Sequence, residues 1–201
     1  MDAGIAYKHF WSPLANWAVQ KLPEDLAPNT ITLVGFLHGL LPLIILYSCV
    51  GLQMVGEIPQ WFFFLQFYCF FMYRLFDEMD GKQARRTGNS SPLGLLFDHG
   101  FDCFIVLIQT LINLAMVQCG NNNIALMTLL TAYFAFHLAT LEEYYVGTLY
   151  LPVVNAVSEG SLLLLLLTLV SGIIGNGFWA TQLIDVTNAE IPGMTFITLG
   201  Q

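Results

Sequence analysis

The chain has 201 residues, of which 56% are hydrophobic and only 10% charged, and its mean hydropathy is +0.67. These values lie far from the usual soluble balance and predict an integral membrane protein. Fourteen acids against six bases give a net charge of −8, which argues against nucleic-acid binding because that function needs basic surfaces. The four cysteines stand singly in apolar segments, so they indicate no redox compartment.

The first predicted element is a helix at residues 9–22. Its tryptophans and leucines recur at three- and four-residue spacings beside lysines, a pattern typical of an amphipathic helix in the membrane interface. The preceding residues lack a basic segment followed by an apolar core, so we expect no cleaved signal peptide. Pro28 ends this helix, and Asn29 or Thr30 is suited to cap the next one.

Five apolar segments then approach or exceed the about 20 residues that a membrane-spanning helix needs. We therefore expect an all-α fold with five spans, at residues 30–51, 60–76, 93–119, 123–145 and 161–174. Short turns rich in Gly, Asn, Ser and Pro separate the first four spans, and a longer polar connection precedes the fifth. No internal repeat is visible, so residues 1–201 form one predicted domain, with 180–201 as a tail.

Four aspartates lie where the second and third spans meet: Asp77 and Asp80 follow the second span, and Asp98 and Asp102 lie near the start of the third. Asp77 and Asp80 are three residues apart, and Asp98 and Asp102 are four apart, so each pair shares one helix face. A charged side chain in or near a bilayer costs roughly 2.5–3.5 kcal/mol, so four of them need a compensating charge. Carboxylate oxygens suit Mg²⁺, Mn²⁺ or Ca²⁺, which predicts bound metal between the two helices.

Small residues accompany these acids on the same faces, at Gly81, Ala84 and Gly94. They allow backbone and ligand to approach closely. The alternative to a metal site is a set of helix-end ion pairs between the acids and nearby bases, namely Arg74, Lys82, Arg85 and Arg86. Lys82 and Arg86 are also candidates for contact with lipid headgroups alone.

Residues 77–102 contain the complete pattern D-x2-D-G-x2-A-R-x8-G-x3-D-x3-D, which resembles the signature of the CDP-alcohol phosphotransferase family. The segments LAPNTITLVG, DGKQARRT, LFDHG and LEEYYVGTLYLP are similar to its choline/ethanolamine phosphotransferase branch. The resemblance implies transfer of phosphocholine or phosphoethanolamine from CDP-choline or CDP-ethanolamine to diacylglycerol, with release of CMP, in phospholipid synthesis. It also implies the endoplasmic reticulum or Golgi membrane, with the mitochondrial inner membrane as the alternative for a complex subunit.

The resemblance assigns two divalent cations, Mg²⁺ or Mn²⁺, to Asp77, Asp80 and Asp98. It leaves Asp102 as a further metal ligand or as the base that takes the proton of the acceptor hydroxyl. His99 is the other candidate base, because imidazole exchanges protons readily at neutral pH. For the nucleotide donor we expect contacts from five residues, namely Asn29, Gly81, Ala84, Arg85 and Gly94.

Two features depart from the family pattern. Glu78 follows the first aspartate, where the branch usually has a small residue, and it adds a carboxylate to the site. Five spans are also fewer than the family's bundle contains, so the chain resembles an incomplete bundle. Three hypotheses stay open: part of a longer enzyme, a short enzyme completed by a homodimer or membrane-complex partner, and a catalytically silent structural or lipid-binding subunit. The sequence does not separate choline from ethanolamine as the headgroup.

Overall fold

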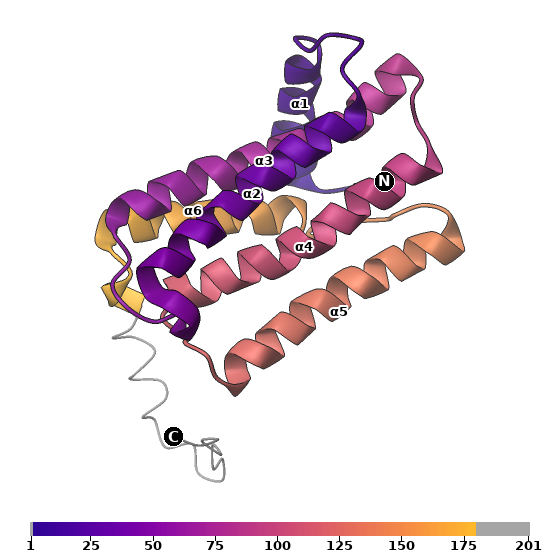
Figure 1. The fold of residues 1–201 in the computed structure, drawn as a ribbon. Coiled ribbons are helices and arrows are strands. Elements are labelled where there is room, and N and C mark those ends of the chain that lie inside the picture. Colours follow the sequence, from indigo (N-terminus) through magenta and orange to yellow (C-terminus); the bar gives the residue numbers. More distant parts are fainter. Residues whose placement is uncertain (1, 180–201) are drawn as a thin grey trace.

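The computed structural model describes residues 2–179, of which 78% are helical (Figure 1). Within these residues there is no β-strand, only an isolated bridge between Asp2 and Leu151, which confirms the all-α prediction. The predicted tail, residues 180–201, lies outside the described residues. In chain order the elements are η1 (Tyr7–Trp11), α1 (Ser12–Val19), α2 (Pro28–Val50), η2 (Gly51–Gln53), α3 (Gln60–Thr87), α4 (Pro92–Met116), α5 (Asn123–Val146) and α6 (Ser158–Ile174).

Local sequence signals set most helix ends. Ser91 caps α4 by accepting a hydrogen bond from Gly94 N, and Asn122 caps α5 by accepting from two backbone amides. Gly88 and Gly147 end α3 and α5 with φ of 68° and 80°, a left-handed conformation that glycine adopts without steric cost. The predicted cap of α2 is wrong, because Ala27 occupies that position without a side-chain hydrogen bond and Pro28 begins the helix.

Among the described residues, three helices are long and apolar enough to cross a membrane, namely Pro28–Gln53 (α2 with η2), Pro92–Met116 (α4) and Asn123–Val146 (α5). The five-span prediction is therefore confirmed in part. Helix α6 is apolar but shorter. Helix α3 continues unbroken from its apolar run, residues 60–76, through the acids to Thr87, which confirms the helical placement of Asp77 and Asp80.

Helix α2 packs against α3 and α4, α6 lies along α3, and α5 contacts α4 at the edge of the bundle (Figure 1). Two glycines on α2 make the close packing feasible. A Cβ at Gly35 would lie 3.0 Å from Phe76 Cβ, and one at Gly39 would overlap Ile105. Because α3 and α4 both approach α2 this closely, the acids at the end of α3 and the start of α4 are brought to the same end of the bundle.

The N-terminal helix is present but ends at Val19, three residues earlier than predicted. Trp11 and Ala15 are fully buried while Trp17 is 62% exposed, so one face of this helix packs on the bundle. Bases from α3 hold it there, since Lys82 Nζ donates to Ser12 Oγ at 3.0 Å and Arg86 Nη1 to Val19 O at 2.8 Å. The prediction that these two bases meet only lipid headgroups is wrong.

Candidate metal centre and adjoining cavity

The predicted acids converge from two helices. Asp77, on α3, and Asp98 and Asp102, on α4, each offer an oxygen atom, and these three atoms all lie within 4.8 Å of one another. The four-residue spacing on α4 places Asp98 and Asp102 on one face, as expected. Three partly buried carboxylates at this separation repel one another strongly, so they favour a bound cation.

Asp80 takes a different position from the other three acids. Its side chain is buried, accepts a hydrogen bond from Thr32 Oγ1 on α2 at 2.5 Å, and accepts another from Gly81 N at 2.5 Å. It lines a cavity together with Asp98. The structure therefore brings together three of the four predicted metal ligands. The fourth, Asp80, lines a cavity beside the cluster, and Asp98 belongs to both the cluster and the lining of that cavity.

The donor set fits a divalent metal. Asp98 Oδ1 is buried and has no hydrogen-bond partner among the residues that the structure describes. Such an oxygen normally costs free energy unless a ligand or ion satisfies it. Oxygen atoms of carboxylates are the ligands that Mg²⁺ and Mn²⁺ prefer, so these residues could hold such an ion.

Two neighbours on α3 fix the orientation of the cluster. Tyr73 OH donates to Asp102 Oδ1 at 2.6 Å, and Arg74 forms an ion pair with Asp77. Arg74 also binds Glu78 Oε1 at 2.9 Å. Of the helix-end ion pairs that were the alternative to a metal site, those of Arg74 with Asp77 and Glu78 are therefore present. Glu78, the residue that departs from the family pattern, meets a base instead of adding an unpaired charge.

The cavity beside the cluster has a volume of about 170 Å³ and lies between the starts of α2 and α4 and the end of α3. All five predicted nucleotide contacts line it, namely Asn29, Gly81, Ala84, Arg85 and Gly94. The missing side chain at Gly94 matters here, because a Cβ would lie 3.3 Å from Ser91 Oγ and 3.6 Å from Asn29 Oδ1. The structure thus groups these residues; their roles stay predictions.

His99 faces away from that cavity. Its Nε2 lies 3.6 Å from Glu143 Oε2 on α5, and both residues line a second, larger cavity of about 510 Å³ between α4 and α5. Leu95 lines both cavities, so they adjoin along α4. The second cavity is lined mainly by apolar and aromatic side chains, including Leu96, Tyr133 and Phe136.

The sequence did not single out Thr32 or Tyr73 as site residues. Thr32 carried a weak signal, because it follows Asn29 by three residues and therefore shares its helix face. Tyr73 stands four residues before Asp77 on α3, but tyrosine at that spacing is common in packed helices. Its contact with Asp102 depends on how closely α3 and α4 pack, which no local pattern encodes.

The helical bundle, the clustered carboxylates and the adjoining cavity define an integral membrane protein with a site that could hold a divalent metal. The family model described as CDP-alcohol phosphatidyltransferase matches residues 25–186, which include every residue of both the cluster and the small cavity. The chain belongs to this family. The family is known to use divalent metals, in agreement with the donor set.

Several curated proteins are similar to the chain. An uncharacterized CDP-alcohol phosphatidyltransferase class-I family protein 3 of Dictyostelium discoideum is 36% identical over 96% of this chain and 49% of its own length. Choline/ethanolaminephosphotransferase 1 of Arabidopsis thaliana is 34% identical over 91% of this chain and 46% of its own length. Cholinephosphotransferase 1 of Xenopus laevis is 36% identical over 82% and 40%, respectively. The chain spans about half the length of these relatives or less.

Proposed function

We propose that the protein transfers phosphocholine or phosphoethanolamine from CDP-choline or CDP-ethanolamine to diacylglycerol and releases CMP. The observation that carries this proposal is that the candidate nucleotide-binding residues and the candidate metal ligands lie next to one another. Five candidate nucleotide contacts share one cavity with Asp80 and Asp98, and Asp98 also belongs to the carboxylate cluster. The names of the similar Arabidopsis and Xenopus proteins support the choline/ethanolamine branch.

The small cavity is the proposed donor site. Arg85 would bind the diphosphate, because its forked guanidinium matches paired phosphate oxygens. Gly81 leaves space for that side chain, since a Cβ there would lie 3.4 Å from Arg85 Nη1. Asn29 would contact the nucleotide through its amide. Divalent cations held by Asp77, Asp80, Asp98 and Asp102 would neutralise the diphosphate charge and stabilise CMP as the leaving group.

The larger cavity between α4 and α5 is the proposed acceptor site, because its apolar lining suits a lipid and it adjoins the donor cavity at Leu95. The diacylglycerol hydroxyl oxygen attacks the β-phosphorus, and the bond from that phosphorus to the CMP oxygen breaks as CMP leaves with the electron pair. The proton passes to a base. Of the two candidates we favour His99, which lines the proposed acceptor cavity beside Glu143, over Asp102, which accepts a hydrogen bond from Tyr73 and belongs to the cluster.

The experiment is an assay of CMP release by the purified chain in lipid nanodiscs containing diacylglycerol, with Mg²⁺ and either CDP-choline or CDP-ethanolamine. We expect CMP from the wild-type chain and none from Asp98→Asn, with Asp25→Asn, an exposed loop position, as the matched control. A chain that binds Mn²⁺ but releases no CMP would contradict catalysis by this chain and favour a silent subunit. In cells, we expect the protein in the endoplasmic reticulum or Golgi membrane.

A further inference from the structure

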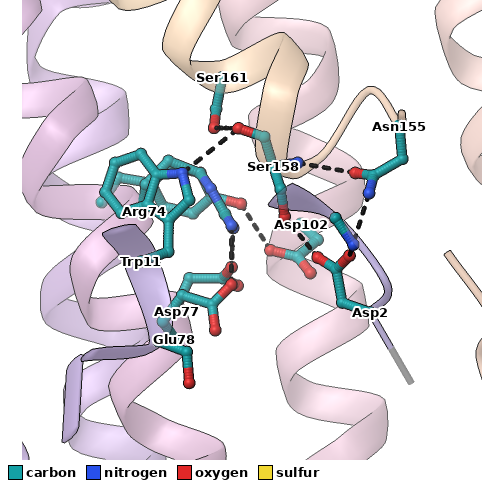
Figure 2. Close-up of polar contacts among 12 residues, drawn as sticks. Asp2, Trp11, Arg74, Asp77, Glu78, Asp102, Asn155, Ser158 and Ser161 are labelled. Atoms are coloured by element: carbon teal, nitrogen blue, oxygen red, sulfur yellow. Dashed lines mark hydrogen bonds and ion pairs between the residues drawn. The ribbon is translucent and has the colours of Figure 1, made fainter. Parts of the chain in front are cut away.

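Arg74 occupies an unusual environment beside the carboxylate cluster. It is 4% exposed, and its guanidinium binds Asp77 through Nη1 and Glu78 through Nη2 (Figure 2). On another side, the Trp11 ring centroid lies 5.5 Å from Arg74 Cζ, within range of a cation–π interaction. One buried cation therefore meets two carboxylates and one aromatic ring, and only one of those carboxylates belongs to the cluster.

Trp11 is itself held in place, so it restricts where Arg74 can go. Its side chain is fully buried, and its Nε1 donates to Ser158 O at the start of α6 at 3.3 Å (Figure 2). Ser158 in turn donates through its hydroxyl to Asp2. Arg74 is thus confined by the N-terminal segment, α6 and its own helix, and it holds Asp77 in one position at little further entropic cost.

A fixed cation next to a metal site has a drawback, because its positive charge opposes the binding of a divalent ion. Glu78 removes this drawback, since its carboxylate binds the same guanidinium at 2.9 Å and is itself only 14% exposed. The charges of Arg74 and Glu78 cancel. Asp77 can then keep its orientation and still present its full negative charge to a cation.

We propose that Arg74 is a positioning residue that fixes Asp77 for metal binding, and that Glu78 balances the charge of Arg74 so that the cluster retains its affinity for a divalent cation. This inference rests on the metal site of the proposed function. It differs from a plain structural ion pair, which would stabilise the helix end without changing metal affinity.

The test measures Mn²⁺ binding to the full chain in detergent by electron paramagnetic resonance, without donor or acceptor. We expect E78Q to raise the dissociation constant about tenfold, because the charge of Arg74 is then unbalanced. R74Q/E78Q removes both charges and should recover most of that loss. The matched control is E24Q, since Glu24 pairs with Arg86 at 3.2 Å on the exposed surface and should leave binding unchanged.

The positioning role has its own readout, the spectrum of the bound Mn²⁺. We expect R74Q/E78Q to change that spectrum, because the ion pair between Arg74 and Asp77 is then lost, and E24Q to preserve it. An unchanged spectrum would overturn the positioning role, and an E78Q affinity equal to wild type would overturn the charge balance. Failure of the wild-type chain to bind Mn²⁺ would instead overturn the metal site of the proposed function. If E78Q does not fold, R74Q/E78Q still tests the positioning role through its spectrum, since it removes the charges of Arg74 and Glu78 together.

Discussion

Replacing Asp98 with asparagine should make the metal-free protein more stable while abolishing its response to metal. Oxygens of Asp77, Asp98 and Asp102 lie within 4.8 Å of one another, so each ionised pair repels by about 3.5 kcal/mol at an effective dielectric constant of about 20. Asp98 takes part in two such pairs. Carboxylates this close share protons and lower the repulsion, so we expect a net gain of about 1–3 kcal/mol in the free energy of unfolding.

Thermal unfolding in detergent measures both effects. In chelator, a gain of this size raises the melting temperature by roughly 2–4 °C per kcal/mol for a chain of this length. Mn²⁺ should raise the melting temperature of the wild type and of the exposed control Asp25→Asn, but not that of Asp98→Asn. A variant that melts below wild type in chelator and still responds to Mn²⁺ would refute the assignment of these acids to a metal site.

Three other changes probe the contacts around the site. Thr32→Val removes the hydroxyl that donates to Asp80 at 2.5 Å and should cost about 1.5–3 kcal/mol in thermal unfolding, whereas Thr32→Ser should cost much less. Gly39→Ala forces a Cβ against Ile105 and should cost about 1–3 kcal/mol, whereas Gly100→Ala, with nothing within 4 Å, should be neutral or stabilising. The Ala6 amide, followed by that of Asn155, lowers the pKa of Glu159 by hydrogen bonding. The hydrogen bonds of ionised Glu159 therefore stabilise the fold fully at pH values above the ordinary pKa range of glutamate. This stabilisation is lost as the pH falls through the lowered pKa of Glu159. The protection factor for hydrogen exchange at Ala6, which corrects for the intrinsic pH dependence of the exchange rate, should fall over that step in the wild type and show no step in Glu159→Gln.

The sequence predicted most of what depends on neighbours along one helix. The spacing of Asp98 and Asp102 correctly placed both on one face, a consequence of the 3.6-residue period that a sequence carries directly. The grouping of Gly81, Ala84 and Gly94 with Asn29 and Arg85, which line one cavity from three helices, came from the family resemblance instead. The apolar runs likewise located the long helices to within a few residues at most ends.

What the sequence could not predict depends on contacts between helices. Four bases lay near the acids, and Arg74, three residues before Asp77, does bind it. Spacing could not tell that Arg86 instead reaches the carbonyl of Val19 at the end of α1. The rotation of about 100° per residue turns His99 off the face of Asp98, but it could not tell that His99 faces Glu143 on α5.

The described helices enclose the two cavities to different extents. This difference distinguishes the binding of metal and nucleotide from transfer to the lipid acceptor. The donor cavity and the carboxylate cluster are built from α2, α3 and α4, of which α3 and α4 both pack on α2. The acceptor cavity is lined by α4 and α5, and only 6% of the apolar window of α5 is buried. Metal and nucleotide binding should therefore not depend on α5, whereas transfer to the lipid acceptor also needs α5 held in place, by the bilayer or by another protein surface. Substitutions on the exposed face of α5, such as Phe134→Ala, should accordingly lower CMP release while leaving Mn²⁺ affinity unchanged.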